Sequence, residues 1–369
     1  MRVSKIKVNT LNQSYNVIVG KNLSNNFSKI LKNNLLNYKK CLFVIDKKVP
    51  KKIVNKICQS FKNKEKFFYF FKSNEINKNF KSINKILNIL LKNNFHRNDC
   101  LISIGGGITG DVSGFAASIL KRGIKFINIP TTLLAQVDSS IGGKTGINSK
   151  YGKNLIGSFY QPSLVVSDIN FLKSLPKREI VCGYAEILKH SLIKNKKLFV
   201  FLDKNGKNIL KLKSPYIEKA IYESCLIKKN IVKKDEKEKN IRKILNFGHT
   251  FAHAYEATNN YSKNLNHGEA VLLGIISASN FAYEKKFLNK NDYNEIINHF
   301  KKLNLPRNIN NFFSKKKINK IISFMQKDKK NNSNNINLVL LTEIGKTTYK
   351  SHFKKNIINE FLKKELVNK

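Results

Sequence analysis

Residues 101–111 read Leu-Ile-Ser-Ile-Gly-Gly-Gly-Ile-Thr-Gly-Asp, a short apolar run that leads directly into a glycine-rich loop. A strand followed by such a loop and a helix places backbone N–H groups and the positive end of the helix dipole where they can hold a phosphate. The spacing is not the G-x-G-x-x-G dinucleotide fingerprint, and tight turns between a strand and a helix are also rich in glycine. Residues 101–111 therefore predict a strand–loop–helix unit, with phosphate binding and a tight turn as the two alternatives for the loop.

Similar apolar runs lie on both sides of this unit. Residues 41–45 and 67–71 precede it, a lysine-rich helical pattern covers 80–94, and residues 125–129 form a run that Pro130 ends. Strands that alternate with helices indicate a mostly parallel sheet with helices on its faces. We therefore expect residues 1–176 to form an α/β domain with a Rossmann-like, mostly parallel sheet. Asp46 follows the first run, where it can either accept a ribose hydroxyl or cap a turn.

The pattern changes after Leu175-Pro176. Long helical periodicity dominates from there on, for example over residues 270–281 and 293–303. We expect a boundary near residue 176 and an all-α, metal-binding domain over residues 177–369. Within it, residues 327–337 predict a polar, low-complexity loop and Leu338–Leu341 a returning strand.

The charge balance is strongly basic. Lys and Arg number 69 against 24 Asp and Glu, which gives a formal net charge of +45. Only six of the 69 are Arg, and the lysines are spread over the whole chain. A nucleic-acid groove would more often cluster its charge and favour Arg. We therefore attribute the excess to drift toward AT-rich codons, with lysines on solvated faces, and expect no specific nucleic-acid partner; a basic nucleic-acid-binding protein is the alternative.

Other global features are those of a cytoplasmic protein. No apolar run reaches the roughly 18 residues that a membrane-spanning helix needs, and the first residues have no signal-peptide block. The five cysteines are scattered without a C-x-x-C pair. The sequence thus predicts reduced thiols and no membrane partner.

Histidines cluster in the second half of the chain. His249, His253 and His267 fall within nineteen residues. Because His249 and His253 are four residues apart, a helix would place both on one face, and spacing alone selects this pair as metal ligands. Glu186 is an additional candidate for a catalytic metal site with three protein ligands and one open position.

Two further segments offer cations to an anionic substrate. A second Gly-Gly pair stands beside Lys144, and Lys153-Asn154 follow closely, which favours a phosphate pocket. Arg242, Asn246 and His249 are spaced to share a helix face. Because Arg is scarce in this chain, Arg242 is expected to have a specific role. We expect it to bind a carboxylate of the substrate next to the metal.

Together these segments resemble the 3-dehydroquinate synthase family, the sugar phosphate cyclases of the shikimate pathway. The resemblance runs from about Cys41 to Leu341, and its most specific blocks are residues 105–111, 130–157, 183–189 and 245–269. It implies a homodimeric enzyme of aromatic amino-acid biosynthesis that converts 3-deoxy-D-arabino-heptulosonate 7-phosphate to 3-dehydroquinate and phosphate. The implied route is transient oxidation, phosphate elimination, reduction, ring opening and aldol closure, without net consumption of NAD.

The resemblance also implies the cofactors and their ligands. One divalent metal, Zn²⁺ or Co²⁺, is expected at Glu186, His249 and His267, so that His253 becomes a nearby acid–base and positioning residue. NAD is expected at a set of residues from the first domain, namely Asp46, Glu75, Lys78, Gly105, Gly106, Gly107, Gly110, Asp111, Thr131, Thr132, Asp138, Ser139, Phe171, Ser174, Leu175 and Glu179.

Substrate-binding residues follow from the same resemblance. The substrate carboxylate is expected at Lys228 and Arg242. The substrate phosphate is expected at Lys144, Asn154, either Lys329 or Lys330, and Arg122, which would reach over from a partner subunit. Ring hydroxyls are assigned to Asp138, Lys189 and Asn246, and the polar shell is completed by Lys153 and Glu238.

The chain departs from the family pattern at a few positions. Lys48, Asn74, Ser174 and Ala252 stand where the family often has Asn, Gly, Thr and Gly, and these changes bear on cofactor affinity rather than on activity. Two rival enzyme classes share part of the pattern. The first is a cyclase that acts on a sugar phosphate without a carboxylate. In such an enzyme the buried cations Lys228 and Arg242 would have no substrate carboxylate to bind, which would be costly. A glycerol-dehydrogenase-like enzyme would not need the phosphate set at residues 144, 153 and 154.

Overall fold

The computed structural model describes residues 3–366 except 12, 35, 62 and 328–334. The chain divides into two compact units, one of residues 1–180 with 221–237 and the other of residues 181–220 with 238–369. The division is discontinuous because the end of one long helix, α7 (Tyr216–Lys234), packs with the first unit. The expected domain boundary near residue 176 stays a prediction. In the described part of the chain, no helix is long and apolar enough to cross a membrane.

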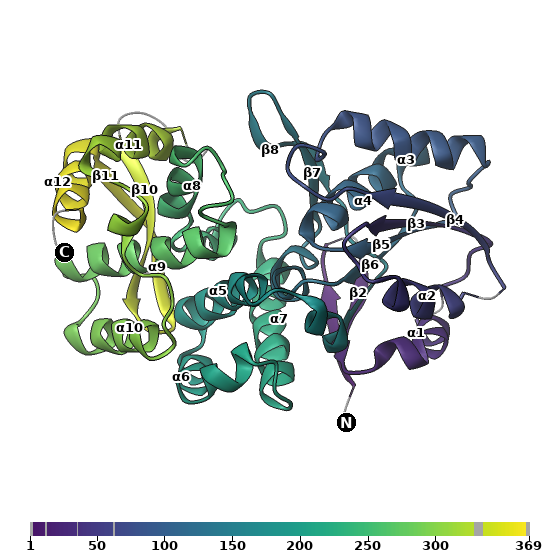
Figure 1. Cartoon of the computed structure of the whole chain (residues 1–369), viewed down its shortest axis with the longest axis horizontal. Coiled ribbons are helices and arrows are strands. Elements are labelled where there is room, and N and C mark those ends of the chain that lie inside the picture. Colours follow the sequence, from purple (N-terminus) through teal and green to yellow (C-terminus); the bar gives the residue numbers. More distant parts are fainter. Residues whose placement is uncertain (1–2, 12, 35, 62, 328–334, 367–369) are drawn as a thin grey trace. The chain divides into compact units, whose positions relative to one another are not determined.

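A seven-stranded sheet organises the first unit (Figure 1). All neighbouring strands are parallel except the antiparallel pair β1–β2. The order β4-β3-β5-β6-β9 is doubly wound and reverses its direction between β3 and β5. The predicted strands at 41–45, 67–71, 101–104 and 125–129 are confirmed, whereas β1, β2 and β9 were not predicted. The strands span, in sheet order, Ser4–Asn9 (β1), Ser14–Gly20 (β2), Leu164–Asp168 (β9), Lys125–Pro130 (β6), Cys100–Gly105 (β5), Lys40–Asp46 (β3) and Glu65–Phe71 (β4).

Helices cover both faces of this sheet (Figure 1). Because side chains alternate along a strand, Phe43 and Ile45 of β3 pack toward α1 (Phe27–Asn33) and α2 (Lys51–Gln59). Leu42 and Val44 pack on the other side, toward α3 (Phe80–Lys92) and α4 (Gly107–Ile119). The predicted Rossmann-like α/β fold is thereby confirmed.

Short elements between the strands complete the first unit. The hairpin β7 (Lys144–Ser149) and β8 (Gly152–Phe159) is antiparallel and was not predicted. A π-helix covers Ala135–Ser139, and π-turns of this kind occur often at functional sites. The 3₁₀ helices are η1 (Leu23–Asn26), η2 (Leu120–Arg122) and η4 (Ile169–Ser174).

The second unit is mainly helical. A capping box starts α9, in which Asn266 accepts from the backbone N–H of Glu269 and the Glu269 side chain accepts from that of Asn266. The expected helical character is confirmed, with one addition: an antiparallel hairpin whose strand β10 contains the predicted Leu338–Leu341. The elements are α5 (Lys177–Lys194), α6 (Lys196–Leu210), η5 (Ile241–Asn246), α8 (His249–Thr258), α9 (His267–Glu284), α10 (Lys290–Lys302), η6 (Ile309–Asn311), η7 (Lys315–Lys317), α11 (Ile318–Gln326), β10 (Asn335–Glu343), β11 (Lys346–Lys354) and α12 (Lys355–Glu365).

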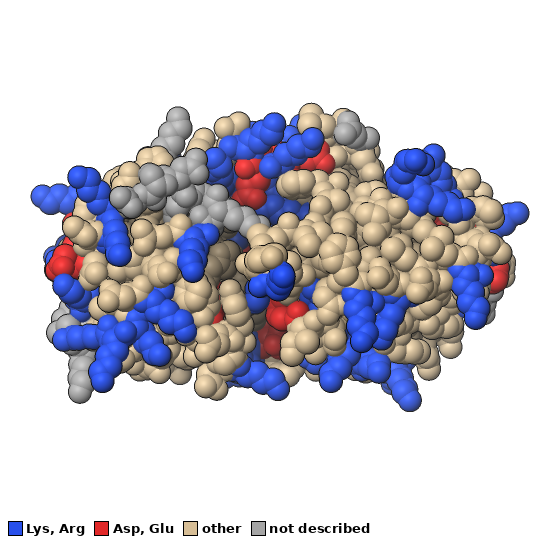
Figure 2. Space-filling view, turned by 90° about the horizontal axis from the view of Figure 1, so that it is seen from above, with Lys and Arg blue, Asp and Glu red and all other residues tan. Residues whose placement is uncertain are grey.

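Cationic side chains are scattered over the surface. On the face that Figure 2 shows, Lys and Arg stand in many separate places rather than in one continuous patch. The expectation that no specific nucleic acid binds stays a prediction.

Candidate active site

Three polar side chains from three helices converge in the second unit. Glu186 lies in α5, and His249 and His267 are the first residues of α8 and α9. Oε1 of Glu186 lies 3.5 Å from Nε2 of His249 and 3.9 Å from Nε2 of His267. One ligand atom from each of the three lies within 4.8 Å of the others. The structure thus brings together the three residues that the resemblance assigns to the metal.

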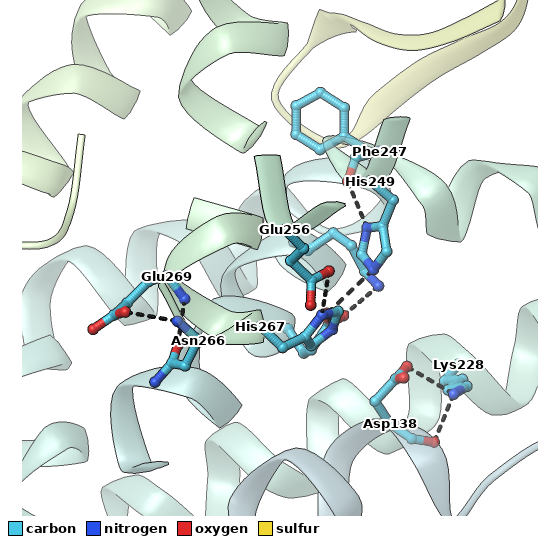
Figure 3. A network of polar contacts seen from close by, with 10 residues as sticks. Asp138, Lys228, Phe247, His249, Glu256, Asn266, His267 and Glu269 are labelled. Atoms are coloured by element: carbon cyan, nitrogen blue, oxygen red, sulfur yellow. Dashed lines mark hydrogen bonds and ion pairs between the residues drawn. The ribbon is translucent and has the colours of Figure 1, made fainter. Parts of the chain in front are cut away.

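The two imidazoles are oriented by oxygen partners on their far sides (Figure 3). Nδ1 of His267 lies 3.2 Å from Oε2 of Glu256, and Nδ1 of His249 lies 3.2 Å from the carbonyl oxygen of Phe247. An Nδ1–H that donates to such an oxygen leaves the Nε2 lone pair for a metal. Glu256 was not predicted, although its position seven residues after His249 places both on one face of α8.

Lys189 completes the charge balance of this cluster. It forms an ion pair with Oε2 of Glu186, and both side chains are almost fully buried. Glu186 therefore turns one oxygen to Lys189 and the other to the histidines. Burial, and next the charge of Lys189, lower the pKa of His249, which favours the neutral imidazole that metals require. One carboxylate and two neutral imidazoles are a donor set that fits a divalent ion such as Zn²⁺.

His253 lies beside the cluster without joining the converging atoms. Its ring centroid is 5.3 Å from that of His249 and 6.5 Å from that of His267, and its side chain is exposed. Among the described residues, the converging group with His249 contains Glu186 and His267 rather than His253. The pair selected from spacing alone is therefore not the one whose atoms meet.

The glycine loop lies at the carboxyl end of β5. Gly106 precedes the first residue of α4, so the loop presents the N-terminus of a thirteen-residue helix. Thr131 donates its backbone N–H to the carbonyl of Gly105 at 2.9 Å, and a Cβ on Gly107 would lie 2.9 Å from Oγ of Ser139. The structure thus brings the predicted Thr131 and Ser139 to the loop.

Asp46 ends β3, on the other side of the point where the strand order reverses. Dinucleotides bind outside the carboxyl ends of the strands at such a point. Oδ1 of Asp46 accepts from the backbone N–H of Lys48 at 3.0 Å, so the turn-capping alternative is realised, while the ribose contact stays a prediction. Burial raises the pKa of Asp46, and the hydrogen bond from Lys48 opposes this shift. The glycine loop and Asp46 together fit a nucleotide with its phosphates at the helix N-terminus.

A polar network joins residues predicted for NAD to residues predicted for phosphate. Nζ of the buried Lys78 lies 2.5 Å from Oδ2 of Asp111 and 2.5 Å from Oδ1 of Asn154. Oε1 of Glu75 lies 3.3 Å from Nζ of Lys153. Burial raises the pKa of Asp111, and the charge of Lys78 opposes the shift. The residues predicted for NAD and those predicted for the substrate phosphate are therefore in direct contact.

Asp138 and Lys228 form a further ion pair of the first unit (Figure 3). Nζ of Lys228 lies 2.7 Å from Oδ1 and 2.5 Å from the carbonyl oxygen of Asp138. Asp138 belongs to the π-helix, and Lys228 is buried. Lys144, predicted for phosphate, is exposed at the start of β7.

Arg242 is fully buried in η5, with 1% of its surface exposed. Nδ2 of Asn246 donates to Oε1 of Glu238 at 2.7 Å, which joins two predicted residues. The prediction that Arg242, Asn246 and His249 share one helix face is wrong. The 3₁₀ helix η5 ends at Asn246, Gly248 takes a left-handed φ of +77°, and α8 starts only at His249.

Four predicted cofactor residues follow β9 in the chain, from η4 to the first turn of α5. Phe171 packs into the core between the sheet and α1 and α2, and Oγ of Ser174 donates to its carbonyl at 3.0 Å. Leu175 donates its N–H to Leu172, and Glu179 is exposed in the first turn of α5.

The remaining predicted residues are placed as follows. Oγ1 of Thr132 accepts from the backbone N–H of Ala135 at 3.2 Å, and Gly110 lies in α4. Arg122 is exposed with a φ of +62°. Lys329 and its alternative Lys330 lie outside the described residues.

The fold is similar to that of two solved sugar phosphate cyclases. A 2-deoxy-scyllo-inosose synthase complexed with carbaglucose-6-phosphate, NAD⁺ and Co²⁺ is 24% identical, with a TM-score of 0.87 and coverage of 98% of this chain and 100% of that one. A 2-epi-5-epi-valiolone synthase from Streptomyces hygroscopicus with NAD⁺ and Zn²⁺ is also 24% identical, with a TM-score of 0.85 and 99% coverage of both chains. At this identity the likeness shows the fold alone, and it places the chain in the fold class of these two synthases.

Sequence comparison defines the family within that class. Residues 68–182 match the model for the 3-dehydroquinate synthase N-terminal domain, and residues 183–331 match that for its C-terminal domain. A 3-dehydroquinate synthase from Pelagibacter ubique is 63% identical over 366 residues, which cover 99% of this chain and 100% of the relative. The chain belongs to the 3-dehydroquinate synthase family, and the resemblance inferred from its motifs is confirmed.

Proposed function

We propose that this chain converts 3-deoxy-D-arabino-heptulosonate 7-phosphate to 3-dehydroquinate and phosphate, as a carbon–oxygen lyase that requires NAD and one divalent metal. Membership in the family supports the reaction. The observation that carries the proposal is the convergence of Glu186, His249 and His267 in the segment that matches the family's C-terminal model. Such a donor set suits Zn²⁺ or Co²⁺, and the two similar structures hold NAD⁺ with one of these ions.

The chemistry divides between the cofactors and the side chains. Bound NAD would take a hydride from the substrate's secondary alcohol and later return it, while the metal would act as a Lewis acid on the alcohol oxygen. Oxidation makes the neighbouring C–H acidic, and phosphate then leaves by β-elimination. Since the leaving phosphate can accept the proton itself, no dedicated base is required. His253, exposed beside both imidazoles, is suited to move protons in the later steps.

Residues of the β7–β8 hairpin would hold the substrate phosphate. Lys144 begins β7, and Lys153 and Asn154 lie in β8. Several donors on one dianion fix its position, and this lowers the entropic part of the barrier. Lys329 or Lys330 would add a further cation. Arg122 would reach the site of a second subunit, which makes the proposed enzyme a homodimer.

Lys228 and Arg242 would hold the substrate carboxylate. Both are buried, where a cation needs an anionic or polar partner. Lys228 already pairs with Asp138, and a substrate carboxylate would bring a further anion to these two cations that a sugar phosphate without a carboxylate lacks. Asp138, Lys189 and Asn246 would bind ring hydroxyls, with Asn246 oriented by Glu238.

NAD would bind to the first unit, at the glycine loop and around Asp46. The N-terminus of α4 is suited to the pyrophosphate and Asp46 to the ribose. Further contacts are proposed from Glu75, Lys78, Asp111, Thr131, Thr132, Asp138, Ser139, Phe171, Ser174, Leu175 and Glu179.

A phosphate-release assay tests the proposal. Purified protein is incubated with the heptulosonate phosphate, NAD⁺ and Zn²⁺, with parallel samples that lack NAD⁺ or contain glucose 6-phosphate instead. We expect release only from the carboxylated substrate in the presence of NAD⁺, with the NAD⁺ concentration unchanged at the end. Folded, metal-loaded protein that releases no phosphate above background, or that releases it from glucose 6-phosphate instead, would refute the proposal.

A further inference from the structure

Asn148 lies between two segments that the proposed function assigns to different ligands. Its Nδ2 donates to Oε2 of Glu75 at 2.7 Å and to the carbonyl oxygen of the same residue at 3.1 Å. Its Oδ1 accepts from the backbone N–H of Asn154 at 3.0 Å. Its own backbone N–H donates to the carbonyl of Lys78 at 2.7 Å. One residue therefore contacts both the proposed NAD segment and the proposed phosphate segment.

The amide group of asparagine is suited to this position because it carries a donor and an acceptor on one rigid plane. The acceptor supports Asn154, whose φ of +54° lies in the left-handed region. A non-glycine residue in this region is kept there by surrounding contacts. The donor, at the other end of the same amide, is directed at Glu75. Movement of Glu75 would thus be transmitted to Asn154 through one side chain.

Two ion pairs reinforce the link. Nζ of Lys78 lies 2.5 Å from both Oδ2 of Asp111 and Oδ1 of Asn154, and Glu75 lies 3.3 Å from Lys153. Burial opposes ionisation of Glu75, but Lys153 first and then the hydrogen bond from Asn148 outweigh it, so the pKa of Glu75 is lowered. Glu75 is therefore an anion at neutral pH and a strong acceptor for Asn148.

We infer that Asn148 is a positioning residue that couples the binding of NAD to the binding of the substrate phosphate. This inference rests on the proposed function. When NAD binds to Glu75 and Lys78, it orders Asn148, and Asn148 in turn holds Asn154 and Lys153 in place for the phosphate. Linkage makes the effect reciprocal, so phosphate tightens the binding of NAD by the same factor.

Calorimetry on the metal-loaded full-length protein tests the coupling. The Kd of NAD is measured with and without saturating inorganic phosphate. In the wild type we expect phosphate to lower the Kd of NAD about five-fold, which is the effect of roughly one hydrogen bond. In Asn148→Ala this factor should fall to about one. Ser149→Ala is the matched control: it removes a hydrogen bond from the neighbouring position of β7, where Oγ accepts from the N–H of Tyr151, and should keep the five-fold factor.

A second variant separates positioning from a merely structural role. Asn148→Asp keeps the acceptor for Asn154 but replaces the donor by a carboxylate next to Glu75. NAD affinity should fall at pH 7.5 and recover as the pH is lowered, because the introduced carboxyl, with its pKa raised by Glu75, regains a proton to donate. If Asn148→Ala does not fold, the inference is tested with Asn148→Asp alone.

The outcomes are distinct. A wild type without any effect of phosphate on NAD affinity, an unchanged factor in Asn148→Ala, or a wild-type affinity at all pH values in Asn148→Asp would each overturn the inference. Failure of the proposed function has a different signature, namely no phosphate release by the wild type in the turnover assay.

Discussion

Glu256 is expected to raise the metal affinity of the site without touching the metal. Its Oε2 lies 3.2 Å from Nδ1 of His267, and 9% of its side chain is exposed. Hydrogen bonds to charged groups contribute about 1.5–3 kcal/mol, and a distance at the long end of the usual range favours the lower half of that interval. In Glu256→Gln the shape is kept and the charge is lost. We therefore expect a loss of about 1.5–2 kcal/mol, or roughly 10–30-fold in metal affinity.

The measurement is a competition titration of the apoprotein with Zn²⁺ against a chelator of known affinity. Visible absorption of bound Co²⁺ reports in parallel whether the coordination geometry is kept. Glu269→Gln is the control, because it makes the same chemical change in the capping box of α9, where Gln is equally suitable. Its metal affinity should stay within about three-fold of the wild type, well inside the change expected for Glu256→Gln.

Two results would contradict this reasoning. Glu256→Gln with a metal affinity within three-fold of the wild type would show that the carboxylate does not support His267. An equal loss in both variants would point to a general loosening of α8 and α9, which thermal melts of the apoproteins would reveal.

Two further changes test other parts of the site, and a third tests the pH dependence of stability. Glu186→Ala should lose bound metal and keep NAD; an unchanged metal content by elemental analysis would exclude Glu186 as a ligand. Arg242→Met should raise the KM for the carboxylated substrate by the equivalent of about 1.5–3 kcal/mol, and an unaltered KM would count against its role. His299 is buried between the hydroxyl of Tyr184 at 2.9 Å and Oδ1 of Asp203 at 3.0 Å, and burial lowers its pKa. As the pH falls below about 6.5, the unfolded chain therefore takes up a proton that the folded chain does not, and stability decreases by at most about 1.4 kcal/mol per pH unit. Chemical denaturation of His299→Gln should show a flatter profile between pH 6.5 and 5 than the wild type; parallel profiles would disprove this account.

Burial on both faces explains why β3 and β5 could be recognised, although β4 was predicted with Phe68 and Phe70 exposed and the short, fully buried β9 was missed. In β3 and β5 every residue after Lys40 is buried. Because both faces of these strands are buried, their sequences are nearly continuous runs of apolar residues. The hairpin β7–β8 is different, because its residues are small, polar or partly exposed and do not form such a run. Its pairing depends on the close approach of Gly146 and Gly157, which no local pattern reveals.

The metal site shows where spacing fails. His249 and His253 have the spacing of a helical ligand pair, yet the atom that meets His249 comes from α5. Helical spacing places two residues on one face but does not say which of them is buried. Glu256 and Asn148 escaped prediction for a related reason, since their roles lie in hydrogen bonds to other elements rather than in a motif.

Because lysine is so abundant in this chain, the sequence alone does not show which lysines belong to the candidate site. Burial in the structure distinguishes some of them from the surface lysines. Among the described residues, the buried lysines are Lys78, Lys189 and Lys228, and each forms an ion pair with a carboxylate. An unpaired ammonium group is costly to bury, so a lysine is expected at a solvated position unless an acid accompanies it. With only 24 acidic residues in the chain, such pairs are few, and the family resemblance had assigned all three of these lysines to the site. Lys144 and Lys153, which we propose to hold the substrate phosphate, cannot be recognised in this way, because a lysine that receives a phosphate from solvent would have to stay accessible.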